Sequence, residues 1–202
     1  MSDFIHLHNH SDYSLLDAAQ TVETMCNRVA DLGMDSIAIT EHGNLFSMIP
    51  FYKSAIKAGI KPIIGCEMYV AVNKHTDRQL VTLDTGKRKN YYHLVLLAMN
   101  QTGYKNLLAL TSIGYLNGFY YRPRIDKDLL KEFNEGLIAT SACLAGEVTS
   151  YAALGNYEEA KNAALSYQKI FNKRFYIELQ NHNLAEEKAS HKILKKISKE
   201  LN

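Results

Sequence analysis

Ser36-Ile37-Ala38-Ile39-Thr40 is a short apolar run rich in β-branched residues, and it predicts a buried strand. A helical pattern over 21–32 precedes this run, and a second helical pattern over 48–58 follows it. The next apolar run, 62–72, is rich in Ile and Val and predicts another strand. Each helical pattern stops at a glycine, a residue that commonly ends helices. Strand and helix therefore alternate from the start, as is typical of an α/β protein.

The same alternation continues to the end of the chain. Further strands are expected at 4–7, 93–99, 137–142 and 175–179, further helices at 102–116, 126–133, 156–171 and 185–201, and an exposed polar loop at 73–90. Repeated strand–helix units favour a parallel sheet, closed or open, with helices outside. These units do not complete an eight-unit barrel, which takes about 250 residues, so the sheet is open or the chain is a fragment. No linker divides residues 1–202, which we interpret as a single domain.

Composition excludes several classes of protein. With 202 residues, 47% of them hydrophobic, the chain is long enough to bury a core in one domain. Its 23 basic and 21 acidic residues give a net charge of +2, too balanced to indicate nucleic-acid binding by charge alone. Cys26, Cys66 and Cys143 are widely spaced without a CxxC pair, which argues against a disulfide framework or a zinc ribbon. The start lacks a signal peptide and no apolar run approaches the ~20 residues that span a bilayer, so we expect a cytoplasmic protein with no membrane partner.

Metal-ligating residue types gather near the ends of the predicted strands. His6, His8 and His10 alternate along an extended segment, so their side chains lie on one side of it, and neighbouring histidines of this kind can chelate one ion. His42 comes two residues after the run that ends at Thr40, and Glu67 follows the apolar start of the next strand. Functional groups collect at the carboxyl ends of strands in parallel α/β folds, so we interpret this group as a metal site.

Three further candidates also have plainer explanations. Asp17 lies in a loop, where a carboxylate commonly begins a turn or a helix. His93 stands at the start of its apolar run, the wrong end of a regular strand for this site, so either the strand bends or His93 is structural. Cys143 follows the strand at 137–142, and a free cysteine is usually a small buried hydrophobe.

These residue types indicate a reaction class. The sequence has no nucleophilic serine motif, P-loop or dinucleotide fingerprint. Several His and carboxylate ligands without those motifs favour metal-assisted hydrolysis, in which clustered divalent ions activate water and hold a phosphate. A phosphoester is therefore the expected substrate.

The segments that carry these residues resemble a known family. They are Phe4-Ile5-His6-Leu7-His8-Asn9-His10-Ser11, Tyr13-Ser14-Leu15-Leu16-Asp17, Thr40-Glu41-His42-Gly43-Asn44-Leu45 and the run 59–67. Together they resemble the start of the bacterial replicative DNA polymerase III alpha subunits and are similar to the polymerase and histidinol phosphatase (PHP) domain found there. Later segments, 93–98, 103–107, 121–126 and 176–179, continue the similarity over nearly the whole chain.

The resemblance implies a fold and a metal centre. The fold is a distorted, TIM-like (β/α) barrel of seven strands, and up to three divalent ions, Zn, Mn or Fe, lie at its carboxyl face. In members that keep the site it supports metal-dependent 3′–5′ exonuclease activity, a proofreading chemistry, and in others it is degenerate and structural. The positions that match the family's ligand pattern are His8, His10, Asp17, His42, Glu67, His93 and Cys143, with His6 and Glu41 as pocket neighbours.

The end of the sequence departs from the family. A final Asp-x-His ligand pair is expected on a strand after the last helix, and the sequence stops at Asn202 before such a pair. The polymerase domains are absent as well. We therefore expect the N-terminal piece of a DNA-directed DNA polymerase, with an incomplete barrel and weakened metal binding.

Three hypotheses of function stay open. The leading one is a metal-dependent phosphoesterase or nuclease domain of a replicative polymerase, with DNA reached through the full-length protein and other replicase subunits as partners. The second is a free-standing PHP phosphatase that acts on a small phosphomonoester such as histidinol phosphate. The third is a non-catalytic, metal-stabilised platform that supports the polymerase and binds a separate proofreading partner.

Overall fold

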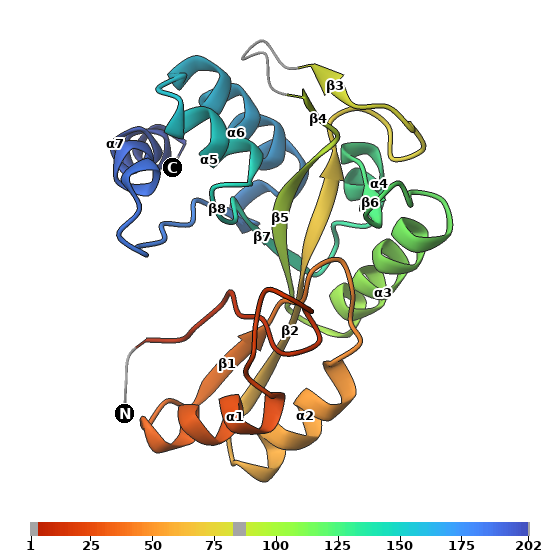
Figure 1. Ribbon diagram of the computed structural model, residues 1–202, viewed down its shortest axis with the longest axis vertical. Helices are drawn as coiled ribbons and strands as arrows, with labels where there is room; N and C mark the ends of the chain where they lie inside the picture. Colours follow the sequence, from red (N-terminus) through yellow and green to blue (C-terminus); the bar gives the residue numbers. More distant parts are fainter. Residues whose placement is uncertain (1–3, 83–87, 202) are drawn as a thin grey trace.

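The structure is a computed structural model that describes residues 4–82 and 88–201 (Figure 1). Its helices are α1 (Val22–Asp31), α2 (Met48–Lys57), α3 (Gln101–Leu116), α4 (Lys127–Glu132), α5 (Glu147–Ala153), α6 (Tyr157–Phe171) and α7 (Ala185–Glu200), with a 3-10 turn at Asn172–Arg174. Its strands are β1 (Ser36–Ile39), β2 (Lys61–Ala71), β3 (Val81–Thr82), β4 (Arg88–Lys89), β5 (Tyr91–Ala98), β6 (Arg124–Ile125), β7 (Leu137–Thr140) and β8 (Phe175–Tyr176). No helix in this described part of the chain is both long and apolar enough to cross a membrane.

The helices expected from the sequence are all present, and α5 is an addition to them. The strand expected at 4–7 is instead an irregular segment beside β1, because Ala38 and Thr40 donate to the carbonyls of His6 and Asn9. The two acceptors, His6 and Asn9, are three residues apart, whereas the two donors, Ala38 and Thr40, are two residues apart. In a regular ladder the two spacings would be equal. The loop expected at 73–90 contains the β3–β4 pair, and its residues 83–87 lie outside the described residues.

One six-stranded sheet has the order β1-β2-β5-β7-β8, with β6 paired to β2. β2 is 11 residues long and changes neighbours along its length. Its first part pairs in parallel with β1, and its second part, from Gly65 to Ala71, pairs antiparallel with β5. In Figure 1, β2 and β5 are the long ribbons that connect α1 and α2 at one end of the molecule with the other helices.

The direction of β5 makes the sheet mixed, which corrects the expectation of a parallel sheet. β5 is antiparallel to both β2 and β7, whereas the β1–β2, β2–β6 and β7–β8 pairs are parallel. A parallel return requires a crossover connection, usually through a helix. No helix lies between β2 and β5 in the residues described there, only the β3–β4 pair, so the chain turns back along β2.

The two edges of the sheet approach each other. The segment that contains His8 lies along the outer edge of β1, while Glu178 follows β8 at the opposite edge. His8 Nδ1 and Glu178 Oε1 are nevertheless only 2.7 Å apart. The sheet therefore curves around a cavity of about 1440 Å3. Within the described residues no pairing joins β8 to β1, so the sheet is open rather than a closed barrel.

Side chains alternate between the two faces of β2 and β5. Cys66 and Met68 of β2, together with Leu94 and Leu96 of β5, are buried in the largest apolar cluster, to which α3, α4, α5, α6 and α7 also contribute. A separate apolar cluster packs α1 and α2 against β1. Glu67 and the other alternate residues of β2 point to the inner face of the curved sheet, where polar side chains gather.

Candidate metal centre

Glu67 is the centre of a cluster of polar side chains on the inner face of the sheet. It lies in the middle of β2, and only 1% of its surface is exposed. The pairing of β1 with β2 ends at Ile64, and His42, in the loop that leaves β1, then forms an isolated parallel bridge with Glu67. A buried carboxylate is costly unless it is paired, so its partners define the site.

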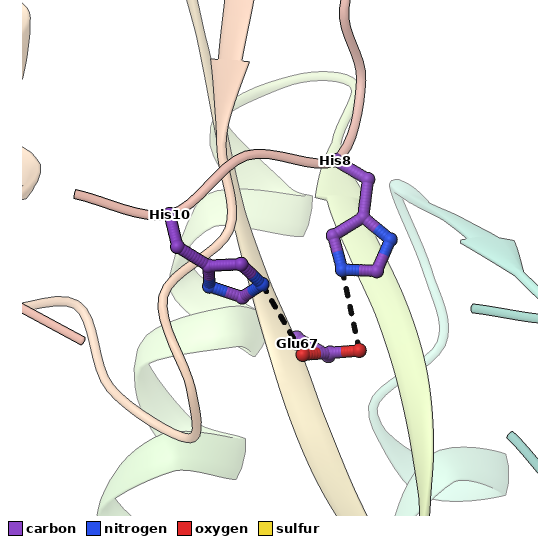
Figure 2. Close-up of side chains that lie close together, drawn as sticks. All are labelled: His8, His10 and Glu67. Carbon is purple, nitrogen blue, oxygen red and sulfur yellow. Dashed lines mark ion pairs between the residues drawn. The ribbon is translucent and has the colours of Figure 1, made fainter. Parts of the chain in front are cut away.

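Four imidazoles surround the Glu67 carboxylate. His8 Nε2 and His93 Nδ1 lie 3.2 and 3.0 Å from Oε1. His42 Nδ1 and His10 Nε2 lie 2.7 and 3.4 Å from Oε2. Figure 2 shows His8 and His10 reaching from the N-terminal segment toward Glu67 on β2. Four of the predicted histidines therefore converge on one predicted carboxylate.

The position of His42 is set by the backbone on either side of it. Glu67 N–H donates to the carbonyl of Glu41 at 3.0 Å, and Gly43 N–H donates to the carbonyl of Glu67 at 2.9 Å. Gly43 has φ +63°, and a Cβ there would lie 2.9 Å from the ring of Tyr69. That ring stacks on His42 with a centroid distance of 6.0 Å. A glycine is therefore required beside His42 both for the backbone conformation and for the close approach of Tyr69.

His93 reaches the cluster because β5 is reversed. It lies opposite Tyr69, two residues beyond Glu67 on β2. The first residues of an antiparallel strand lie at the same edge as the carboxyl ends of the strands around it. The backbone N–H of His93 donates to the carbonyl of Ala145 at 3.1 Å, which fixes this end of the strand. The place of His93 at the start of its apolar run is thus compatible with a position in the cluster.

Cys143 and Asp17 lie at the margins of the cluster. Cys143 Sγ is 3.5 Å from Glu67 Oε1 and 3.6 Å from His93 Nδ1. Asp17 Oδ2 is 2.9 Å from Nε2 of His42, whose other ring nitrogen faces Glu67. The Asp17 side chain is 62% exposed, so this side of the cluster is open to solvent.

The two expected pocket neighbours have different surroundings. Glu41 is buried and accepts hydrogen bonds from the hydroxyls of Ser11 and Ser14. Ser14 Oγ also lies 3.3 Å from His10 Nδ1, so Glu41 contacts the cluster through this serine. His6 is exposed, packs edge-on against Phe4 and lines the cavity inside the curved sheet.

Contacts within the cluster change the pKa values of its members. Burial opposes ionisation of Glu67, but close contacts with the four imidazoles outweigh burial and hold the pKa of the carboxyl far below its ordinary value. Burial also lowers the pKa of His8, but contacts with Glu178 and Glu67 outweigh it and raise the pKa to about 10. Burial, reinforced by the charge of Glu67, raises the pKa of Cys143 to about 12. The cluster therefore stabilises positive charge beside Glu67, either as a proton or as a cation.

The arrangement of donor atoms fits metal ions. His42 Nδ1 is buried. It lies 2.7 Å from Glu67 Oε2, yet the two atoms form no hydrogen bond, and the described residues offer Nδ1 no other hydrogen-bond partner. The described residues contain two groups of three possible ligands. Within each group the ligand atoms lie within 4.8 Å of one another, and Glu67 belongs to both groups. The groups are His8, His10 and Glu67, and His42, Glu67 and His93. Imidazole and carboxylate ligands suit Zn, Mn or Fe, and a shared carboxylate suits a centre with more than one ion.

Glu178 belongs to this site although the sequence did not single it out as a ligand. Besides its contact with His8, its Oε1 accepts a hydrogen bond from Gln180 Nε2 at 2.7 Å. Its Oε2 accepts a hydrogen bond from the hydroxyl of Thr140. The available signal was a lone carboxylate inside the apolar run 175–179, next to the carboxyl end of a predicted strand.

A family model described as the PHP domain matches residues 6–182. The chain belongs to the PHP domain family. This PHP domain is 52% identical to the DNA polymerase III subunit alpha of Borreliella burgdorferi, over 99% of the chain and 17% of that protein. It is 47% identical to the DNA polymerase III subunit alpha of Helicobacter pylori, over 92% of the chain and 16% of that protein. The PHP domain thus spans only about a sixth of the length of these curated relatives.

A solved structure, that of an amidohydrolase from Chromobacterium violaceum, has a weaker likeness. Its TM-score is 0.40 with 24% sequence identity, over 55% of this chain and 33% of that one. At this TM-score the likeness supports no conclusion about the function of the PHP domain.

Proposed function

We propose that the chain is the PHP domain of a bacterial DNA polymerase III alpha subunit and that it hydrolyses phosphoesters with divalent metal ions, as a 3′–5′ exonuclease on DNA. The observation that carries this proposal is the set of four imidazoles within 3.4 Å of the Glu67 carboxylate. The polymerase relatives favour DNA as the substrate. DNA synthesis would belong to other parts of the longer protein, in the cytoplasm and with other replicase subunits.

The residues of the cluster would have different roles in such a site. The ligands that would hold the ions are His8, His10, His42, Glu67 and His93, with Asp17 and Cys143 at the margins. Divalent ions bound there would supply a Lewis acid for the phosphate and lower the pKa of a water molecule. Glu67 belongs to both ligand groups and would hold their ions close together. Asp17 places an exposed carboxylate beside His42, where it can accept a proton at the open side.

Arg122 places a positive charge at the rim of the site. Its side chain is exposed, and its Cζ lies 5.9 Å from the centre of the Tyr69 ring. That ring in turn stacks on His42. A guanidinium group pairs with phosphate oxygens through two parallel hydrogen bonds. We therefore assign to Arg122 the binding of a substrate phosphate on the His42 side.

A non-catalytic platform is the second candidate function, and one observation favours it. The cluster lies between two separate apolar clusters, since β1, which precedes His42, packs against α1 and α2, whereas the strands of Glu67 and His93 belong to the larger cluster. Metal ions held by these residues would cross-link the two parts. Metal binding of this kind adds directly to the free energy of unfolding.

A His8→Ala, His10→Ala double variant separates the two functions. A 3′–5′ exonuclease predicts that the wild-type protein with Mn²⁺ shortens a 5′-labelled single-stranded oligonucleotide and that the double variant does not. A platform predicts a lower melting temperature for the variant and no hydrolysis by either protein. Glu23→Gln is a suitable control, because Glu23 pairs with Lys57 on the surface away from the cluster. Wild-type protein that binds Mn²⁺ but releases no nucleotide would contradict the catalytic proposal.

We further propose that in the longer protein the sheet closes into a distorted seven-stranded barrel. The contact between His8 and Glu178 supports this closure, because it already brings the two edges of the sheet together. A closing strand with the Asp-x-His pair would then complete the ligands and the single domain. Elemental analysis should find more metal per chain in a version extended through that strand than in residues 1–202. Equal metal content would contradict the closure.

A further inference from the structure

We propose that Glu178 is a positioning residue for the metal centre, holding His8 so that one ring nitrogen faces Glu67. This inference rests on the proposed metal function and adds a residue outside the ligand set. It follows from how the two nitrogens of the His8 ring are shared. Nδ1 lies 2.7 Å from Glu178 Oε1, and Nε2 lies 3.2 Å from Glu67 Oε1.

The pairing with Glu178 selects the tautomer that metal binding needs. A carboxylate accepts hydrogen bonds, so the proton of a neutral His8 ring belongs on Nδ1, facing Glu178. Nε2 then presents its lone pair to the centre beside Glu67. Ligand histidines commonly donate their second ring nitrogen to a carboxylate in this way, which fixes the ring and increases its basicity.

Glu178 is itself held in place by three other groups. Thr140 donates to Oε2, Gln180 donates to Oε1, and the backbone N–H of Glu178 donates to Ser141 Oγ at 2.9 Å. Both carboxylate oxygens therefore have partners outside the cluster. These partners keep Glu178 behind His8, in a supporting position, instead of among the residues that face Glu67.

The position of His8 makes such support necessary. His8 lies on the irregular N-terminal segment, which backbone hydrogen bonds attach to β1 only at His6 and Asn9 in the described part of the chain. A ligand on an irregular segment is placed accurately only when other groups lock its side chain. Glu178 provides this lock from the opposite edge of the sheet.

A second pair in the molecule has the same local chemistry without the metal centre. His182 Nδ1 lies 2.7 Å from Glu187 Oε1, the same distance as in the His8–Glu178 pair. The His182 side chain is 68% exposed, and Glu187 also accepts the backbone N–H groups of His182 and Leu184 where α7 begins. Glu187→Gln is therefore a matched control for a carboxylate that supports only structure.

The test is the affinity for Mn²⁺, measured by calorimetry and by the loss of the free Mn²⁺ magnetic resonance signal. Glu178→Ala should weaken Mn²⁺ binding by about 10- to 100-fold, as is typical when a carboxylate behind a ligand histidine is removed. Glu178→Gln should have a smaller effect, because its amide oxygen still accepts a hydrogen bond from Nδ1. Glu187→Gln should bind Mn²⁺ like the wild type. With Co²⁺ in place of Mn²⁺, the visible absorption should change in the two Glu178 variants and not in Glu187→Gln.

Two results would overturn the positioning role. One is wild-type Mn²⁺ affinity in both Glu178 variants, under conditions where His8→Ala loses it. The other is an equal loss in Glu178→Gln and Glu187→Gln together with equal drops in melting temperature of the metal-free proteins, which would mark both carboxylates as structural. If the wild-type protein binds no Mn²⁺, the proposed metal function fails, and the positioning role fails with it.

Discussion

Glu67 and Asp126 are both buried carboxylates that contact a histidine, but they differ in their other partners. Asp126 precedes α4, and its Oδ1 accepts the backbone N–H groups of Asp128 and Leu129 at 3.1 and 3.0 Å. Its Oδ2 accepts the backbone N–H of His75 at 3.0 Å and lies 2.6 Å from Nδ1 of the same residue. In the described chain, the Glu67 carboxylate is instead surrounded by four imidazoles and the thiol of Cys143, whereas the Asp126 carboxylate contacts one imidazole.

This difference separates a structural carboxylate from a candidate metal ligand. A backbone N–H does not release its proton, so Asp126 has three permanent donors, two of which belong to the first turn of α4. An imidazole can present either an N–H or a lone pair. All four imidazoles around Glu67 can therefore exchange a proton for a cation, whereas around Asp126 only the His75 ring can. The type of donor distinguishes the two sites better than the mere presence of a histidine beside a carboxylate.

The largest expected effect comes from removing each carboxylate charge in turn. Glu67→Gln should lower the affinity for Mn²⁺ by more than about 100-fold, beyond the usual cost of changing a residue behind the ligands. Asp126→Asn should leave the affinity unchanged and lower the free energy of unfolding by about 1–2 kcal/mol, because hydrogen bonds to a charged acceptor weaken. Calorimetric titration with Mn²⁺ and urea unfolding measure the two quantities. A large loss of Mn²⁺ affinity in Asp126→Asn would remove the distinction.

A second effect concerns the pH dependence of metal binding. Burial lowers the pKa of His8, but Glu178 and Glu67 raise it to about 10, so an ion that binds His8 must displace a proton below that pH. The Mn²⁺ affinity should therefore rise with pH, by about tenfold per unit for one displaced proton, between about pH 6 and pH 8. Titrations in buffers of different ionisation enthalpy count the protons released. Asp126→Asn should have the same profile, and an affinity independent of pH would contradict the proton exchange.

At Asp126 the effect of pH should be on the free energy of unfolding and not on metal binding. Burial raises the pKa of Asp126, but the hydrogen bond from His75 and those from backbone N–H groups outweigh burial and lower it below its ordinary value. A carboxyl with a depressed folded-state pKa contributes stability above its unfolded pKa, about 3.9, and loses it as the pH falls further. Urea unfolding should therefore separate wild type from Asp126→Asn at neutral pH, with a difference that shrinks below about pH 4. A constant difference down to acid pH would mean that the charge of Asp126 adds no stability.

The sequence predicted which residues gather around Glu67 better than it predicted how they meet. His8 and His10 could be grouped because alternation along a chain places side chains on one side. The position of His93 depended on the direction of β5. The polar run 73–90 has no helical pattern, which is compatible with the antiparallel return of β5, whereas the repeated strand–helix units elsewhere favour a parallel sheet.

Other features could not be predicted because they depend on contacts distant in sequence. Glu178 is 170 residues from His8, and its role follows only from the curvature that brings the two edges of the sheet together. Asp126 and His75 are 51 residues apart, and the sequence marked neither as part of a cluster. Residue type and local spacing identify candidate ligands, whereas the distinction between a ligand and its support requires the packed sheet.

The smallest expected effect separates the two arginines that accompany these regions. Arg124 is buried and donates to the carbonyls of Gly118, His75 and Asp77, so its charge is committed to structure near Asp126. Arg122 is exposed over the Tyr69 ring, on the side of the Glu67 cluster.

Arg122→Ala should raise the KM for an oligonucleotide by about 3- to 10-fold, the loss of about 1 kcal/mol from one exposed ionic contact. The Mn²⁺ affinity and melting temperature of this variant should not change, because the Arg122 side chain is exposed and lies over the Tyr69 ring, which is not a proposed ligand. Arg122→Lys should recover part of the loss by keeping the charge without the planar fork. An unchanged KM in Arg122→Ala, in a protein that does hydrolyse the oligonucleotide, would mean that Arg122 does not bind the substrate phosphate. The contrast between the two regions would then rest on Glu67 and its imidazoles.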